Sequence, residues 1–222
     1  GPNAACAFEC ITATDGQEFK LGNATIRVIH TPGHTMESTT YLLIDENNEE
    51  HGILSGDTLF IGDVGRPDLA QHVIAELTQD KLARHLYHSL REKIMPLPDH
   101  LIVYPNHGAG SACGKMMSKE TTDTLGNQKK TNYALNPKMT EDEFVTAVLT
   151  GLTNPPGYFP SNVLMNINGS ESLDSILKKA KTPLTASEFK LIATETNALL
   201  LDTRAASESS SDFAGSGEVV VD

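Results

Sequence analysis

Three short turns constrain this sequence most, because each follows a β-prone apolar run and each carries a side chain that can bind a metal. The first turn, residues 31–35, reads Thr-Pro-Gly-His-Thr and follows the β-branched run 25–30. The second turn carries Asp57, and the third carries His107. A single Gly-His or Gly-Asp turn is an ordinary loop feature, but three in succession favour a set of ligands at strand ends. Two imidazoles and one carboxylate suit Zn, Fe or Mn.

Composition narrows the class of protein. The chain has 222 residues, enough for one large domain or one domain and part of another. Its net charge of −12 argues against nucleic acid or an anionic membrane surface as a partner, because both require clustered Lys and Arg. No apolar run of about 18 residues is present, so no membrane span is expected. Three sparse cysteines do not make a disulfide framework and favour a reducing, cytoplasmic compartment.

Hydrophobic periodicity predicts alternating strands and helices. Leu82, Leu86, Leu90 and Ile94 recur four apart and predict an amphipathic helix over about 80–94, with Asp80 as its N-cap. A capping box at 140–143 predicts a second helix that ends near residue 149. Residues 108–137 are expected to form a long ordered loop or short helical turns. Further strands are expected at 25–30, at 101–104, and in a hairpin made by 39–45 and 51–55.

The three turns together resemble a known family. In order, Thr-Pro-Gly-His-Thr at 31–35, Ser-Gly-Asp-Thr-Leu-Phe at 55–60 and Pro-Asn-His-Gly at 105–108 are similar to the metallo-β-lactamase fold, over about residues 1–180. That resemblance implies an α/β fold, an αββα sandwich with its metal site at one edge. Met-Glu-Ser at 36–38 stands where glyoxalase II hydrolases have Gly-His, and Gly-Arg-Pro-Asp-Leu at 65–69 is similar to the persulfide dioxygenases.

Two further stretches resemble the bacterial branch in which the dioxygenase is fused to rhodanese domains. They are Gly-Ala-Gly-Ser-Ala-Cys-Gly-Lys at 108–115 and Leu-Leu-Leu-Asp-Thr-Arg at 199–204, the latter similar to the opening of a rhodanese domain. We therefore expect a metallo-β-lactamase-like domain over 1–182 and the beginning of a truncated rhodanese-like domain over 183–222. The rhodanese-like part holds no cysteine, and whether 207–222 are native continuous sequence stays open.

The resemblance implies one Fe(II), held by two histidines and one aspartate, that oxidises a persulfide R-S-SH with O₂ and water to R-SH and sulfite. His34 and Asp57 match two of those ligands. Such a facial set leaves positions for O₂ and for the persulfide sulfur. Arg66 matches the arginine that pairs with a carboxylate of the thiol carrier, for which a guanidinium fork is suited. The alternative for Arg66 is a structural salt bridge with Asp63 or Asp68.

Two more residues have roles that the sequence leaves open. His107 matches a ligand of the second metal in dinuclear relatives, and in the dioxygenases it is expected beside the metal without binding it. Cys113 follows the His107 loop closely enough to relay sulfane sulfur as its own persulfide, or it is a buried inert cysteine. The expected partner is a small thiol persulfide, built on glutathione, coenzyme A or a similar carrier. A homo-oligomer also stays open.

The family's first motif, His-x-His-x-Asp-His, has no counterpart in residues 1–33. We therefore expect a fragment that lacks the first iron histidine and about half of the sandwich, with iron weakly held. Two alternatives to the dioxygenase remain. One is a dinuclear-metal thioester hydrolase of the glyoxalase II type, with zinc as the metal, and the other is a non-oxidising sulfur-carrier module.

Overall fold

A computed structural model describes residues 1–2, 4–69, 76–181 and 183–196. The chain divides into two units, Gly1–Ser170 and Glu171–Asp222. The first unit holds a single mixed sheet in the order β1-β2-β3-β4-β5-β6. Its strands are β1 (Glu18–Leu21), β2 (Ala24–His30), β3 (Thr39–Ile44), β4 (Glu50–Gly56), β5 (Ile102–Pro105) and β6 (Asp123–Thr124).

Neighbouring strands are antiparallel except for β4 and β5, which run parallel. The helices of this unit are α1 (Gln79–His88), a π-helical turn η2 (Ser89–Ile94), α2 (Leu125–Thr131), a 3₁₀ turn η3 (Tyr133–Leu135), α3 (Glu141–Leu149) and α4 (Phe159–Asn168). Because β2, β4 and β5 all run in one direction, their carboxyl ends meet at the same edge of the sheet. This topology brings the three turns of the sequence together.

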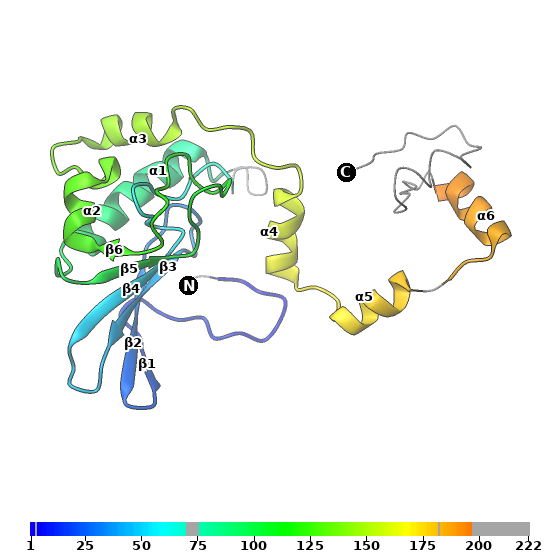
Figure 1. Cartoon of the computed structure of the whole chain (residues 1–222), viewed down its shortest axis with the longest axis horizontal. Helices are drawn as coiled ribbons and strands as arrows, with labels where there is room; N and C mark the ends of the chain where they lie inside the picture. The colour runs from blue at the N-terminus through cyan, green and yellow to red at the C-terminus, as the bar shows by residue number, and fades with distance from the viewer. Residues whose placement is uncertain (3, 70–75, 182, 197–222) are drawn as a thin grey trace. The chain divides into compact units, whose positions relative to one another are not determined.

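One face of the sheet forms the core. Leu42, Ile53 and Val103 pair in register across β3, β4 and β5 and are almost completely buried. The core continues into α1, η2 and α3, which lie along the same side of the sheet (Figure 1), through Leu86, Leu90, Ile94, Phe144 and Val148. The sequence neighbours of these three core residues are Tyr41, Leu54 and Tyr104. They pair with one another on the opposite face of the sheet, where each is about two-fifths exposed.

The predicted hairpin, the strands at 25–30 and 101–104 and the capping box of α3 are confirmed. The N-cap prediction is wrong: Thr78, not Asp80, accepts the N–H of Lys81 and begins α1. The predicted helix over 80–94 changes to a π-helical turn at Ser89. The region 108–137, expected as a loop or short helical turns, contains β6, α2 and η3. Strand β1 and helix α4 were not predicted.

The second unit contains α5 (Leu173–Ala180) and α6 (Ala186–Thr196). A reciprocal pair of hydrogen bonds between Thr185 and Glu188 begins α6, as the capping-box pattern indicates. The stretch 199–204, which resembles the opening of a rhodanese domain, lies outside the described residues, so the rhodanese-like domain stays a prediction. No helix in the described residues has the length and apolar character needed to cross a membrane.

Candidate metal centre

The candidate centre lies at the edge of the sheet where β2, β4 and β5 end. His34 follows β2, Asp57 comes directly after β4, and His107 follows β5. Oδ2 of Asp57 lies 3.3 Å from Nε2 of His34 and 3.3 Å from Nε2 of His107. The structure thus places two imidazoles around one carboxylate oxygen, as the spacing of the three turns predicts.

The backbone around His34 fixes which of its nitrogens is available. Nδ1 of His34 lies 2.8 Å from the carbonyl oxygen of Arg66. A carbonyl oxygen can only accept, so Nδ1 carries a proton, and Nε2 is the ring nitrogen that faces Asp57. Histidines that bind metals almost always donate their other N–H to a carbonyl or carboxylate in this way. The arrangement therefore fits metal binding through Nε2.

The His34 turn is held against the helix behind it. Ser89, at the start of the π-helical turn, is buried and donates its hydroxyl to the carbonyl oxygen of Pro32 at 2.7 Å. Gly33 adopts a φ of 151°, and a Cβ there would lie 2.4 Å from Cβ of Leu86. Only glycine can make that approach, so this contact sets the position of the turn.

Buried hydroxyls connect the turns of His34 and Asp57. Thr31 and Thr58 place their Oγ1 atoms 2.7 Å apart, and Thr40 lies 3.2 Å from Thr31. All three threonines are fully buried. Thr31 lies just before His34, and Thr58 follows Asp57 directly. The contacts between the threonines therefore hold the two candidate ligands in fixed positions relative to each other.

His107 is held from two sides and is more exposed, at 39% of its side chain. Its ring contacts Phe60 edge-on, with ring centroids 5.9 Å apart. The preceding residue, Asn106, donates its N–H to the carbonyl oxygen of Gly56 at 3.2 Å, which connects the third turn to the second.

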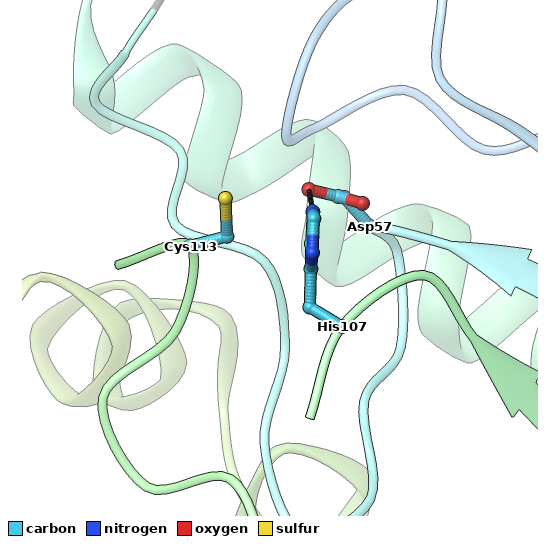
Figure 2. Close-up of side chains that lie close together, drawn as sticks. All are labelled: Asp57, His107 and Cys113. Carbon is cyan, nitrogen blue, oxygen red and sulfur yellow. Dashed lines mark ion pairs between the residues drawn. The ribbon is translucent and has the colours of Figure 1, made fainter. Parts of the chain in front are cut away.

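Cys113 joins this group from the loop after β5, and Figure 2 shows its sulfur beside Asp57 and His107. Ligand atoms of Asp57, His107 and Cys113 all lie within 4.8 Å of one another. Burial raises the pKa of the Cys113 thiol, the nearby Asp57 carboxylate raises it further, and Ser111 and Arg66 oppose this. The thiol is thus a half-buried group at the centre.

Arg66 is 2% exposed and its donors are engaged within the protein. Nε and Nη2 bind the two oxygens of Asp68, each at 2.6 Å, as a bidentate fork. Nη1 donates to the carbonyl oxygen of Ala112 at 3.3 Å, and Nη2 also donates to that of Thr153 at 2.6 Å. Of the alternatives for Arg66, the salt bridge with Asp68 is the contact present, and the role in substrate binding stays a prediction.

The supporting roles of two residues escaped the sequence reasoning. Asp63, 1% exposed, accepts the N–H groups of Lys115 and Met116, each at 2.6 Å, and so holds the loop that follows Cys113. It also accepts the hydroxyl of Tyr133, whose pKa is raised by burial and by the Asp63 carboxylate. Ser89 is the second. Neither residue has a sequence signal beyond its polarity, because their partners lie far along the chain.

These elements together define a metallo-β-lactamase α/β fold, and the candidate centre lies at one edge of its sheet. A solved metallo-β-lactamase from Staphylococcus aureus subsp. aureus COL is similar to 72% of this chain, with a TM-score of 0.65 and 34% sequence identity, over 45% of that protein. Persulfide dioxygenases are among the homologues: the human mitochondrial persulfide dioxygenase ETHE1 is 30% identical over 133 residues, 59% of this chain and 42% of that protein.

Another relative is the probable polyketide biosynthesis zinc-dependent hydrolase BaeB of Bacillus velezensis. It is 33% identical over 113 residues, 50% of this chain and 44% of BaeB. The matched part therefore spans less than half the length of these curated relatives. No family model matches the sequence.

Proposed function

We propose that this chain acts in an iron-dependent persulfide dioxygenase, which oxidises a small thiol persulfide with O₂ to the thiol and sulfite in sulfide detoxification. The observation that carries the proposal is the placement of His34 and Asp57, with Nε2 of His34 3.3 Å from Oδ2 of Asp57. The match to human persulfide dioxygenase, together with Met-Glu-Ser at 36–38, supports it over other activities of the fold.

His34 and Asp57 would hold the iron, which when bound supplies the redox chemistry that O₂ requires. Their side chains are 14% and 13% exposed, so they are shielded from bulk water yet reachable. The proton on Nδ1 of His34 stays with the carbonyl oxygen of Arg66. His107 would orient Asp57 from its other side without binding the iron.

Cys113 can take part by sulfur transfer. Its thiol would attack the outer sulfur of R-S-SH, so that the substrate S–S bond breaks, Cys113-S-SH forms and R-SH leaves with the proton. The half-buried position beside Asp57 supports this role. The proposed thiol carriers are glutathione and coenzyme A. The proposal also includes a rhodanese-like unit over 183–222 and a cytoplasmic location of the protein.

An oxygen electrode tests the proposal directly. The intact protein that contains this sequence, loaded anaerobically with Fe(II), should consume O₂ and release sulfite when glutathione persulfide is added. Asp57→Ala should abolish both, whereas Asp45→Ala, a carboxylate in the β3–β4 turn, should leave them unchanged. An intact protein that holds iron but consumes no O₂, or one that holds two zinc ions and consumes none, would show that the proposal is wrong.

A dinuclear thioester hydrolase is the second candidate, and the distance of 3.3 Å between Asp57 and Nε2 of His107 favours it. In that enzyme two metals would share Asp57 and activate a water molecule. The match to the hydrolase BaeB adds support. His107→Ala should then halve the metal content and abolish hydrolysis of a glutathione thioester, and unchanged metal content would exclude this candidate.

A further inference from the structure

We infer that Asp63 positions the thiol of Cys113 at the candidate centre and so makes Cys113 competent for the sulfur transfer, which itself rests on the proposed function. Oδ2 of Asp63 accepts the backbone N–H groups of Lys115 and Met116, each at 2.6 Å. These are the second and third residues after Cys113, so the carboxylate holds the chain just beyond the thiol. Asp63 is therefore a positioning residue, which acts on the sulfur through the backbone.

The buried carboxylate of Asp63 is suited to hold a loop, because both of its oxygens are engaged. Oδ1 accepts the N–H of Val64 at 2.9 Å and the hydroxyl of Tyr133 at 3.1 Å, so the carboxylate cannot turn away from its place. Oδ2 faces the two loop amides. Hydrogen bonds to a charged acceptor are shorter and roughly twice as strong as neutral ones. Removal of the carboxylate would leave both amides without their acceptor, and the loop would have to move to satisfy them.

The loop lies directly against the carboxylate at Gly114, the residue between Cys113 and the two amides. A Cβ at Gly114 would lie 3.0 Å from Oδ2 of Asp63, tighter than an ordinary van der Waals contact. Glycine is therefore needed here for the close approach of the backbone. Because a single residue without a side chain separates Cys113 from the anchored amides, the place of the carboxylate determines the place of the thiol.

The chain on the other side of the thiol is held by the same segment that carries Asp63. Arg66 donates its backbone N–H to the carbonyl oxygen of Cys113 at 3.0 Å, and its Nη1 donates to that of Ala112 at 3.3 Å. Further upstream the loop is open, since a Cβ at Gly108 would meet nothing within 4 Å. The contacts with residues 63 and 66 thus fix the thiol from both sides.

The place of the thiol matters because sulfur transfer requires a defined approach. Figure 2 shows the sulfur of Cys113 beside Asp57 and His107, and ligand atoms of the three residues lie within 4.8 Å of one another. In the transfer, Sγ of Cys113 bonds to the outer sulfur of R-S-SH, the substrate S–S bond breaks, and R-SH leaves with the proton. A misplacement of about 1 Å can slow such a reaction about 100-fold.

Asp63→Ala in the intact protein that contains this sequence tests the inference, with two reagents offered to Cys113 in the absence of O₂ and followed by mass spectrometry. Alkylation by iodoacetamide should become faster by about tenfold or more, because a released loop exposes the half-buried thiol. Sulfur uptake from glutathione persulfide should become slower by about tenfold or more, because the thiol leaves its place. The exposed Cys10 is the internal reference for both reagents. A merely structural role predicts that both rates rise together, and that result, or two unchanged rates, would overturn the inference.

Two further variants separate the position of the thiol from the stability of the fold. Tyr133→Phe is the matched control, because it removes a hydrogen bond to Oδ1 of Asp63 and leaves both loop amides bound. It should leave both rates at Cys113 close to those of the wild type. Asp63→Asn keeps an oxygen for the two amides and should lie nearer to the wild type than Asp63→Ala does. The reverse order would contradict the inference.

A second measurement needs no variant and therefore does not depend on whether Asp63→Ala folds. Amide hydrogen exchange of the wild-type protein should show the N–H groups of Lys115 and Met116 protected, although both residues lie outside helices and strands. Exchange at the rate of an unprotected chain would overturn the inference. If wild-type Cys113 took up no sulfur while its alkylation changed as expected, the sulfur transfer would be wrong and the placement of the thiol by Asp63 would stand.

Discussion

The imidazole of His34 donates its Nδ1–H to the backbone carbonyl oxygen of Arg66 at 2.8 Å. With Nδ1 engaged in this contact, Nε2 is the ring nitrogen that faces Oδ2 of Asp57, 3.3 Å away. A ring that was free to rotate or to change tautomer would lose part of its metal affinity, about 10–100-fold when such a supporting contact is removed. The backbone carbonyl of Arg66 thus fixes the orientation of the His34 ring in the absence of a metal.

The tautomer of His34 is the first prediction. Long-range ¹H–¹⁵N NMR of the metal-free chain, prepared with a chelator, should show His34 protonated at Nδ1, because the carbonyl of Arg66 can only accept. His100 provides an internal comparison, because its Nε2 lies 2.9 Å from the carbonyl oxygen of Glu50 and should carry the proton. A His34 spectrum with the proton on Nε2 would contradict the orientation described here.

Gly33→Ala is expected to destabilise the protein by about 2–4 kcal/mol, since it combines overpacking with backbone strain. The new Cβ would lie 2.4 Å from Cβ of the fully buried Leu86, and φ at this position is 151°. Urea denaturation measures the loss. Gly108→Ala is the matched control, because it also neighbours a histidine of the centre but a Cβ there meets nothing within 4 Å.

The control should change the free energy of unfolding by less than about 1 kcal/mol. Gly33→Ala should also bind the metal more weakly than Gly108→Ala does, because the turn before His34 has to move. If both variants were equally stable, the contact of Gly33 with Leu86 could not be what positions the turn.

Arg66→Met should destabilise the protein by about 3–5 kcal/mol, because it leaves the buried carboxylate of Asp68 without its partner. Asp68 is 6% exposed and binds the guanidinium through both oxygens. Adding Asp68→Leu should restore much of the loss, since the unpaired charge is then removed. Denaturant midpoints of the two single variants and the double variant give the coupling energy.

The alternative role of Arg66 in binding the thiol carrier predicts a different pattern. In that case Arg66→Lys would leave the free energy of unfolding unchanged while it raised KM for the persulfide. A structural role predicts that Arg66→Lys lowers stability, because an ammonium cannot replace the bidentate fork.

The order of the three turns and their place at strand ends could be predicted because each follows a run with clear β-type residues. Their convergence follows once β2, β4 and β5 are known to be parallel to one another. The strand β1 gave a weaker signal, because it is only four residues long and three of those residues are exposed. The helix α4 likewise has no buried residue and carries a proline in its first turn.

The π-helical turn had a signal that is easy to overlook. Leu82, Leu86, Leu90 and Ile94 are spaced by four, whereas an α-helix has 3.6 residues per turn, so each step drifts by about 40°. A wider turn corrects this drift, and Met95 indeed donates to Leu90 five residues back. The sequence alone could not reveal that this turn points Ser89 at Pro32.

The choice of partner for Arg66 was also beyond sequence reasoning. Asp63 and Asp68 lie three and two residues away, so spacing does not separate them. The structure pairs Arg66 with Asp68 and uses Asp63 for backbone N–H groups near Cys113. The difference depends on how the loop 108–118 folds back over the site, which no local pattern encodes.

The β3–β4 turn gives the last prediction, a dependence of stability on pH. A hydrogen bond from the His51 ring, reinforced by the N–H of Glu49 and by Asn47, lowers the pKa of Asp45 to about 2. The ordinary value in an unfolded chain is about 3.9. Because the folded-state pKa is the lower one, the stabilisation is complete above about pH 4 and is lost as the pH falls toward about 2.

Asp45→Asn should therefore be less stable than the wild type at pH 7, and the difference should vanish by about pH 2. Urea midpoints at several pH values measure this, and the comparison cancels the contribution of other groups. His51→Ala removes the first donor, so carboxyl NMR should then show the Asp45 titration moved upward, toward its ordinary range. A difference between wild type and Asp45→Asn that stayed constant down to pH 2 would show that the charge of Asp45 does not stabilise the turn.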